Sequence, residues 1–209
     1  MFSKRWIAGL TALVLGFAGA VSAVRAQAGR APEVLIKEVS TDVLAALRAD
    51  KSVKQGDVAQ IIALVDTKVM PHVDFQRMTA SAVGRYWRQA TPEQQKRLQD
   101  EFKVMLVRTY SGALAQVQDQ TVELKPSRNA ADAKEVVIRT EVKGRGDSVQ
   151  LDYRLAQAAD GWKIYDVNVL GVWLVENYRN SFSQEIGASG IDGLIEKMAS
   201  RNKSGAAKS

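Results

Sequence analysis

Apolar side chains recur at steps of three and four through the first half of the chain, which is the spacing of one face of an α-helix. One stripe follows Pro32, and a second ends before Pro71, which lacks a backbone N–H and restricts the residue before it. A shorter helix is predicted between Asp74 and Trp87. The two stripes consist of Ile36, Val39, Val43 and Leu47, and of Val58, Ile61, Ile62, Val65 and Val69.

The clearest helix start in the chain lies at Thr91–Gln94. Thr91 is suited to cap the helix, Pro92 fits its first turn, and Gln94 completes a capping box. The apolar stripe that follows is wide and continues for about seven turns, so one long helix is predicted. Its members are Leu98, Phe102, Met105, Leu106, Tyr110, Leu114 and Val117.

From Thr121 the apolar period changes from helical to alternating, as expected for strands with one buried face. The clearest strand, 148–157, is bracketed by turn signals at Gly144–Asp147 and Ala159–Gly161. The sequence therefore predicts an antiparallel four-stranded meander covered by helices, and thus the α+β class. The strands are expected at 121–126, 134–143, 148–157 and 162–169, with further helices at 172–186 and 191–198.

Residues 1–28 have the layout of a secretory signal peptide. Lys4 and Arg5 form a basic start, an uncharged apolar stretch follows, and the segment ends at Ala26-Gln27-Ala28, which fits signal peptidase. We expect cleavage after Ala28, in preference to an uncleaved membrane anchor. A second possible cut follows Ala23 and changes only the mature start. The chain has no cysteine, so it carries no lipidation site, disulfide or thiolate metal site.

The remaining chain is long enough for one domain, which we place at 29–200. The tail 201–209 is rich in Lys, Ser, Gly and Ala, and it is predicted to be disordered and basic. Cleavage removes three basic residues and no acidic ones, so the net charge falls from +6 to +3. Basic residues are also spread among acids, which argues against nucleic-acid binding.

Few side chains point to catalysis. The single histidine, His72, lies in a predicted connection and is interpreted as a surface residue. Asp166 lies within a predicted strand, where a carboxylate paired with an arginine or a backbone donor is favoured over a catalytic base. No phosphate loop, metal-ligand spacing or nucleophile elbow occurs, so no cofactor or metal is expected. Apolar and aromatic residues instead form a large interior, which is either a packed core or a lined cavity.

The segment from Asp74 through Ala82–Arg88 to Thr91–Gln95 resembles the MlaC family, also called the toluene-tolerance family of periplasmic phospholipid-binding proteins. Further segments that resemble the family follow in the same order along the chain and without a large gap, so the resemblance spans about residues 34–200. They lie at 107–110, 149–154, 162–167, 177–179 and 190–195.

The resemblance implies a sheet related to the cone-shaped NTF2-like folds, with an apolar lipid cavity. It implies a periplasmic carrier, not an enzyme, whose cargo is a glycerophospholipid. The implied partners are an inner-membrane ABC transporter complex bearing an MCE-type protein and an outer-membrane lipoprotein–porin complex, each docked transiently. The resemblance further implies that such shuttling maintains outer-membrane lipid asymmetry. The alternatives are a hopanoid-type carrier, a periplasmic adaptor without ligand, and an NTF2-like isomerase or dehydratase using Asp166 or His72.

The lipid-binding side chains are expected on the sheet and its covering helices. Trp173 places a large indole where some relatives carry a small polar residue, so either the pocket depth or the ligand itself is expected to differ. Arg85, Arg88 and Arg179 are candidates for head-group or partner contacts, with solvated helix charges as the alternative. The predicted lipid-binding set is Phe75, Trp87, Phe102, Leu106, Tyr110, Val137, Leu151, Tyr153, Val167, Val169, Trp173, Tyr178 and Phe182.

Overall fold

The computed structural model describes residues 29–130 and 132–206. The predicted signal peptide and its cleavage site therefore lie outside the described residues. The described chain is α+β, as predicted, with an antiparallel sheet in the order β1-β2-β3-β4-β5. The strands are β1 (Thr121–Leu124), β2 (Glu135–Lys143), β3 (Val149–Ala158), β4 (Gly161–Val169) and β5 (Val172–Trp173).

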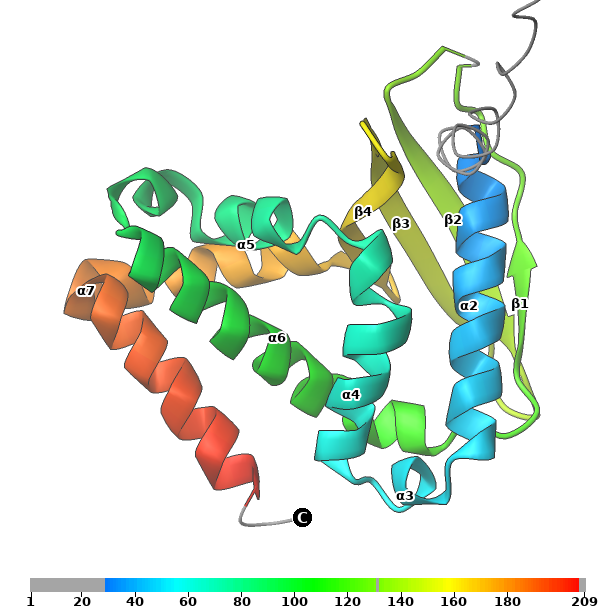
Figure 1. Cartoon of the computed structure of the whole chain (residues 1–209), viewed down its shortest axis with the longest axis horizontal. Coiled ribbons are helices and arrows are strands. Elements are labelled where there is room, and N and C mark those ends of the chain that lie inside the picture. The colour runs from blue at the N-terminus through cyan, green and yellow to red at the C-terminus, as the bar shows by residue number, and fades with distance from the viewer. Residues whose placement is uncertain (1–28, 131, 207–209) are drawn as a thin grey trace, which may run out of the picture.

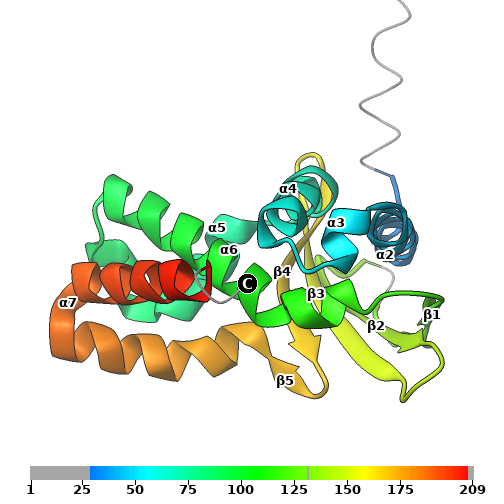
Figure 2. The ribbon, with the colours of Figure 1, turned by 90° about the horizontal axis from the view of Figure 1, so that it is seen from below.

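The helices divide into two groups (Figure 1). α2 runs along β1 and β2, whereas α5, α6 and α7 pack together beside β4. α4 lies between the two groups and contacts both α2 and α6 (Figure 2). The helices are α2 (Pro32–Ala49), α3 (Lys51–Lys54), α4 (Val58–Lys68), α5 (Phe75–Val83), α6 (Pro92–Ala115) and α7 (Leu174–Ala206), with short 3₁₀ turns η1 (Met70–His72) and η2 (Gly84–Gln89).

The start of α6 confirms the predicted capping box. The Thr91 hydroxyl accepts from the Gln94 N–H at 3.2 Å, and the Gln94 side chain accepts from the Thr91 N–H at 3.0 Å. These bonds satisfy two backbone donors that a helix start otherwise leaves free. α6 then continues for 24 residues, as the long apolar stripe predicts.

The sequence did not reveal β5, which forms a hairpin with β4. Val172 and Trp173 were expected to begin a helix, but they pair with Val169 and Asn168. The two connecting residues both have positive φ, with 52° at Leu170 and 90° at Gly171. This is the backbone pattern of the tight hairpin turn that matches strand twist. Leucine is rare at such a position, so the turn carries no usual sequence signal.

The chain end also differs from the prediction. Gly190, with φ 74° and ψ 178°, separates α7 into two straight halves. The second half continues through Ala206, so a disordered tail from Arg201 is wrong for 201–206. The Asn202 amide donates to the Glu101 carbonyl at 3.0 Å and to its carboxylate at 2.7 Å, which ties this end to α6. Residues 207–209 lie outside the described chain.

The register assigns the side chains of the sheet to two faces. Ile138, Tyr153 and Val167 stand opposite one another on β2, β3 and β4, and this row defines the inner face, which packs under α2. Neighbouring residues point the other way, because side chains alternate along a strand. Arg154 and Asp166, which are paired across β3 and β4, therefore define the outer face.

Three apolar clusters share the interior. The first lies among α5, α6 and α7, the second between α2 and the inner face, and the third among α2, α3, α4 and α6. Only partly buried side chains connect the first two clusters, namely Val73 and Val167. The interior of the described chain is thus not one continuous core, and apolar surface remains where the clusters adjoin.

Candidate functional site

Four of the predicted lipid-binding residues lie together on the inner face. Tyr153 pairs with Val167, and Leu151 pairs with Val169, so the four side chains form two adjacent rows. All four are only partly buried, although they point toward the helices. The helices therefore leave apolar surface of the sheet incompletely covered.

The phenol of Tyr153 is surrounded by protein atoms. Burial raises the pKa of its phenol, while the Ser40 and Thr140 side chains beside the hydroxyl act in the opposite direction. The side chain nevertheless keeps some accessible surface. Deep placement with residual accessible surface is what we expect of a ligand-lining residue.

Three predicted residues on the helices are also partly exposed. Leu106 and Tyr110 belong to α6, and Tyr178 belongs to the first half of α7. Burial raises the pKa of the Tyr110 phenol, and the nearby Tyr178 adds to that shift. The two phenols are therefore neighbours across the α6–α7 contact, with accessible apolar surface on both.

Other predicted residues belong to the packed core of the first cluster. Phe102 is fully buried, and its ring centroid lies 5.8 Å from Phe75, 5.1 Å from Tyr178 and 5.2 Å from Phe182. Phe182 is 4% exposed. Trp87 and Phe75 pack against the same cluster and are partly buried. Phe102 and Phe182 thus serve the core, which the sequence left open as the alternative.

The structure does not bring Val137 and Trp173 to the inner face. Val137 pairs with Arg154, which places it on the outer face. Trp173 pairs with Asn168 on the same side, and the Arg154 guanidinium stacks over its ring at 3.8 Å. Both residues therefore lie on the face opposite the four inner-face residues, because strand alternation and an unrecognised hairpin direct them there.

Asp166 has a structural environment, as predicted. Its carboxylate is 1% exposed and lies 3.1 Å from Arg154. It also accepts from the backbone N–H groups of Val167 at 2.9 Å and Val175 at 3.1 Å. Burial raises the pKa of Asp166, whereas these donors and Arg154 lower it. Because Val175 lies in the first turn of α7, the carboxylate joins β4 to the start of that helix.

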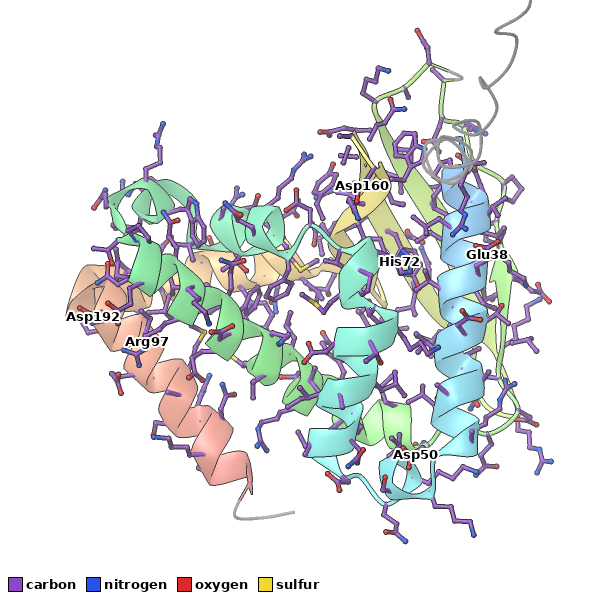
Figure 3. All side chains as sticks on the ribbon, viewed as in Figure 1. Glu38, Asp50, His72, Arg97, Asp160 and Asp192 are labelled. Atoms are coloured by element: carbon purple, nitrogen blue, oxygen red, sulfur yellow. The ribbon has the colours of Figure 1, made fainter. Side chains whose placement is uncertain are left out.

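His72 lies in η1, between the end of α4 and α2 (Figure 3). It lines a crevice of about 10 Å³ with Asp160 and Lys163, which has no room for a substrate. Burial lowers the pKa of His72, and Lys163 and Arg30 lower it further. The geometry thus agrees with the non-catalytic interpretation of this histidine.

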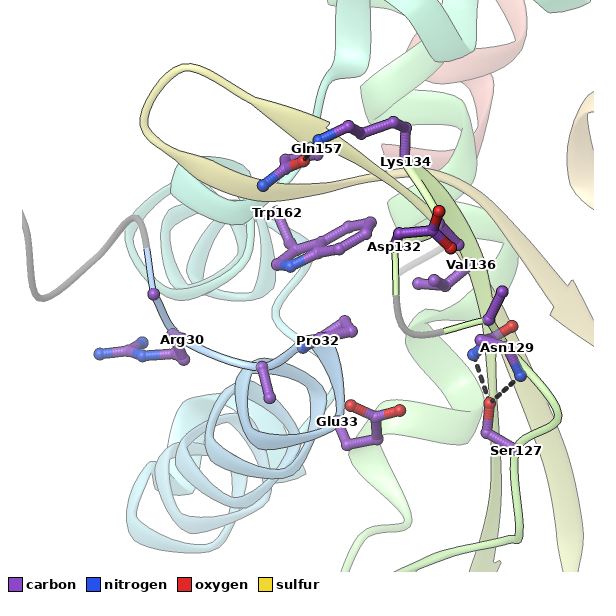
Figure 4. A pocket seen from close by; sticks show the side chains of 14 residues that line it. Arg30, Pro32, Glu33, Ser127, Asn129, Asp132, Lys134, Val136, Gln157 and Trp162 are labelled. Carbon is purple, nitrogen blue, oxygen red and sulfur yellow. Dashed lines mark hydrogen bonds between the residues drawn. The ribbon is translucent and has the colours of Figure 1, made fainter.

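A polar hollow of about 480 Å³ lies at the N-terminal end of α2 (Figure 4). Arg30, Glu33, Asp132 and Lys134 line it together with the indole of Trp162. None of the predicted lipid-binding residues borders this hollow. Its charged lining is unsuited to acyl chains, since each buried charge would lose water without gaining a partner.

A second hollow lies between α6 and both halves of α7. Met105 and Tyr178 border it, and Arg108 and Arg201 contribute cationic groups. Its volume is about 430 Å³. Sequence reasoning did not select Met105 or either arginine. The hollow forms where α7 approaches α6, and this tertiary contact leaves little trace in the sequence. The only sequence signal is that Arg108 belongs to the 107–110 segment of the family resemblance.

The described residues contain neither a metal-binding group nor a membrane-spanning helix. Within 29–130 and 132–206, no three histidine, aspartate or glutamate side chains are grouped so that they could hold a metal ion. Among the described helices, none combines the length and the apolar character needed to cross a bilayer.

Two curated proteins are similar to this chain in sequence. The toluene tolerance protein ttg2D of Pseudomonas putida is 27% identical over 167 residues, which cover 79% of this chain and 77% of the relative. The intermembrane phospholipid transport system binding protein MlaC of Haemophilus influenzae is 23% identical over 199 residues, covering 93% and 92%.

A solved structure matches closely as well. It is the phospholipid-binding protein from Ralstonia solanacearum in complex with a phospholipid, with a TM-score of 0.82 and 44% identity. The match covers 85% of this chain and 99% of that chain. The family model described as MlaC protein matches residues 37–200, which is most of the chain. This chain therefore belongs to the MlaC family.

Proposed function

We propose that this protein is a periplasmic carrier that holds one phospholipid, with the acyl chains against the inner face of the sheet. One observation carries the proposal: a relative with 44% identity and the same fold is a phospholipid-binding protein in complex with a phospholipid. The incompletely covered apolar residues of this chain's inner face supply a matching surface. The export signal predicted at residues 1–28 supports the compartment.

The proposed contact surface has two sides. Leu151, Tyr153, Val167 and Val169 form the sheet side, and their register holds them in two rows. The helix side consists of Leu106, Tyr110 and Tyr178. The space for the chains would lie where the apolar clusters adjoin. Phe102 and Phe182 would support it from behind without touching the lipid.

Energetics explain why a protein is needed for this task. Each methylene group costs about 0.8 kcal/mol to expose to water, so two sixteen-carbon chains cost on the order of 25 kcal/mol. A carrier must offset most of this cost with a dry apolar surface. It needs no catalytic group, and the structural roles of Asp166 and the confined position of His72 support a protein that is not an enzyme.

We further propose that the carrier delivers lipid between an inner-membrane transporter complex and an outer-membrane lipoprotein–porin complex. The Haemophilus influenzae relative supports this, because it is the binding protein of an intermembrane phospholipid transport system. Release at each end requires docking surfaces that bind weakly, so that the carrier can leave.

Mass spectrometry of organic extracts tests the carrier function directly. The mature protein is purified from the periplasm without detergent, and near-stoichiometric phospholipid is the expected result. A well-folded protein without any lipid would contradict the proposal and favour an adaptor or an enzyme. A hopanoid ligand would keep the carrier role but change the cargo.

Two matched variants then test the location of the lipid. Val167→Glu places a charge on the inner face, and Val137→Glu places the same charge on the outer face. Both positions are partly buried valines on central strands. We expect Val167→Glu to lose bound lipid and Val137→Glu to retain it. Undiminished lipid in folded Val167→Glu would remove the inner face from the site.

A further inference from the structure

The hollow between α6 and α7 combines an apolar wall with unpaired cations. Met105 and Tyr178 provide the wall, and Arg108 and Arg201 also line the hollow. Tyr178 also neighbours Tyr110 on the proposed lipid surface. The hollow therefore adjoins that surface, and a group at the end of an acyl chain could reach both arginines.

Arg108 lacks a partner in the part of the chain that the structure describes. Its Nε atom is buried and donates to no acceptor. The side chain also forms no ion pair with any described residue. Buried donors are normally satisfied, so an orphaned guanidinium donor indicates that an anion or another acceptor belongs there.

The nearby carboxylates do not supply that anion, because each is already engaged. Glu101 accepts from the Asn202 amide at 2.7 Å. Glu185 pairs with Lys197, and Arg201 only contributes to the lowered pKa of Glu185 from a distance. Arg201 forms no ion pair of its own with the described residues. Two guanidinium groups thus border one hollow without a bound counter-charge among the described side chains.

We propose that Arg108 and Arg201 bind the phosphate group of the phospholipid at this hollow. This assignment rests on the carrier function proposed above. Phosphate esters carry negative oxygens whose spacing suits the planar guanidinium fork, which makes arginine an effective phosphate ligand. The acyl chains would pass from Tyr178 toward the inner face, while the head group stays near solvent beside the end of α7.

Binding measurements with two fluorescent lipids test the assignment. One probe is a labelled phosphatidylethanolamine, and the other is a diacylglycerol with the same label and acyl chains but no phosphate. The variants are Arg108→Gln, Arg201→Gln and the double variant, each delipidated and checked by circular dichroism. Arg128→Gln is the matched control, since Arg128 is exposed in the connection between β1 and β2.

We expect the double variant to weaken phosphatidylethanolamine binding about tenfold or more, the scale of a lost charge-assisted contact. Diacylglycerol binding should change little, and the control should match the unmodified protein with both probes. Equal weakening for both probes would assign the arginines a structural role, and unchanged phospholipid binding would overturn the proposal. Because Arg201 is exposed, Arg201→Gln remains informative if Arg108→Gln fails to fold.

Inorganic phosphate separates a head-group site from a site for the free ion. We expect millimolar phosphate to compete weakly with the phospholipid probe and not with diacylglycerol. Tight phosphate binding that the variants abolish, together with unchanged phospholipid binding, would assign the hollow to the free ion instead. If the unmodified protein binds neither lipid probe, the carrier function itself fails, which is distinct from failure of the arginine assignment.

Discussion

Replacing Phe102 with alanine separates core packing from lipid contact. The Phe102 ring is fully buried and touches three other aromatic rings at centroid distances of 5.1 to 5.8 Å. A buried phenylalanine replaced by alanine costs about 3–5 kcal/mol in total, a range that already includes the lost contacts with neighbouring side chains. We expect a loss of about 4 kcal/mol, in the middle of this range, because small side-chain movements refill only part of the cavity.

Urea unfolding of the delipidated protein measures this loss. With a slope of about 2 kcal/mol per molar urea, the midpoint should fall by about 2 M. Leu106→Ala is the comparison on the same helix, since Leu106 is only partly buried. Leu106→Ala should reduce the free energy of unfolding of the lipid-free protein by less than Phe102→Ala does. Relative to the stability that each variant loses, Leu106→Ala should weaken lipid binding more.

The reasoning fails if Phe102→Ala costs less than about 1 kcal/mol in the lipid-free protein yet abolishes lipid binding. That result would mean that Phe102 faces the ligand and that the aromatic cluster rearranges when lipid is absent. Phe102→Leu provides a further check, because it keeps much of the volume and should restore most of the stability.

Three further outcomes follow from individual contacts. Thr91→Ala should reduce the free energy of unfolding by about 1 kcal/mol through loss of the capping box, and an unchanged urea midpoint would contradict this. His72 should titrate below the ordinary value of about 6.5 in NMR, because burial disfavours its charged form. The free energy of unfolding should therefore fall as pH drops from about 6.5 to the lowered native pKa of His72, because the unfolded chain binds the proton first. His72→Gln should remove this pH dependence. Asp166→Ala should cost about 3 kcal/mol in urea unfolding, since it leaves the N–H groups of Val167 and Val175 without their acceptor and removes one of the two carboxylates that pair with Arg154. A loss below about 1 kcal/mol would argue against the buried network.

The division of the interior into separate apolar clusters suits a small domain that must remain stable with and without the proposed apolar ligand. The aromatic cluster around Phe102 and the contacts of α2 with the sheet form two separate clusters, which only the partly buried Val73 and Val167 connect. Removing lipid from the surface between them would therefore leave both clusters in place. A carrier that loads and unloads needs this property, because the empty form must also remain folded.

Local sequence signals determined most of the elements of this protein. The capping residues at Thr91 and Gln94 act on their own backbone, so they fixed the start of α6 without reference to the rest of the fold. The alternation in 148–157 likewise depends only on strand geometry, and it correctly placed Leu151 and Tyr153 on one face. Each of these signals needs only interactions between residues that are close in sequence.

Tertiary structure alone decided which side chains meet. Val137 and Trp173 have the same apolar character as their neighbours, but strand register and an unsignalled Leu170-Gly171 turn direct them to the outer face. Phe102 became core because the first half of α7 lies against α6, where the Tyr178 and Phe182 rings enclose it. The return of the chain after Gly190 brings Arg201 beside Arg108 across ninety-odd residues. Such contacts depend on long-range packing, which periodicity and composition do not encode.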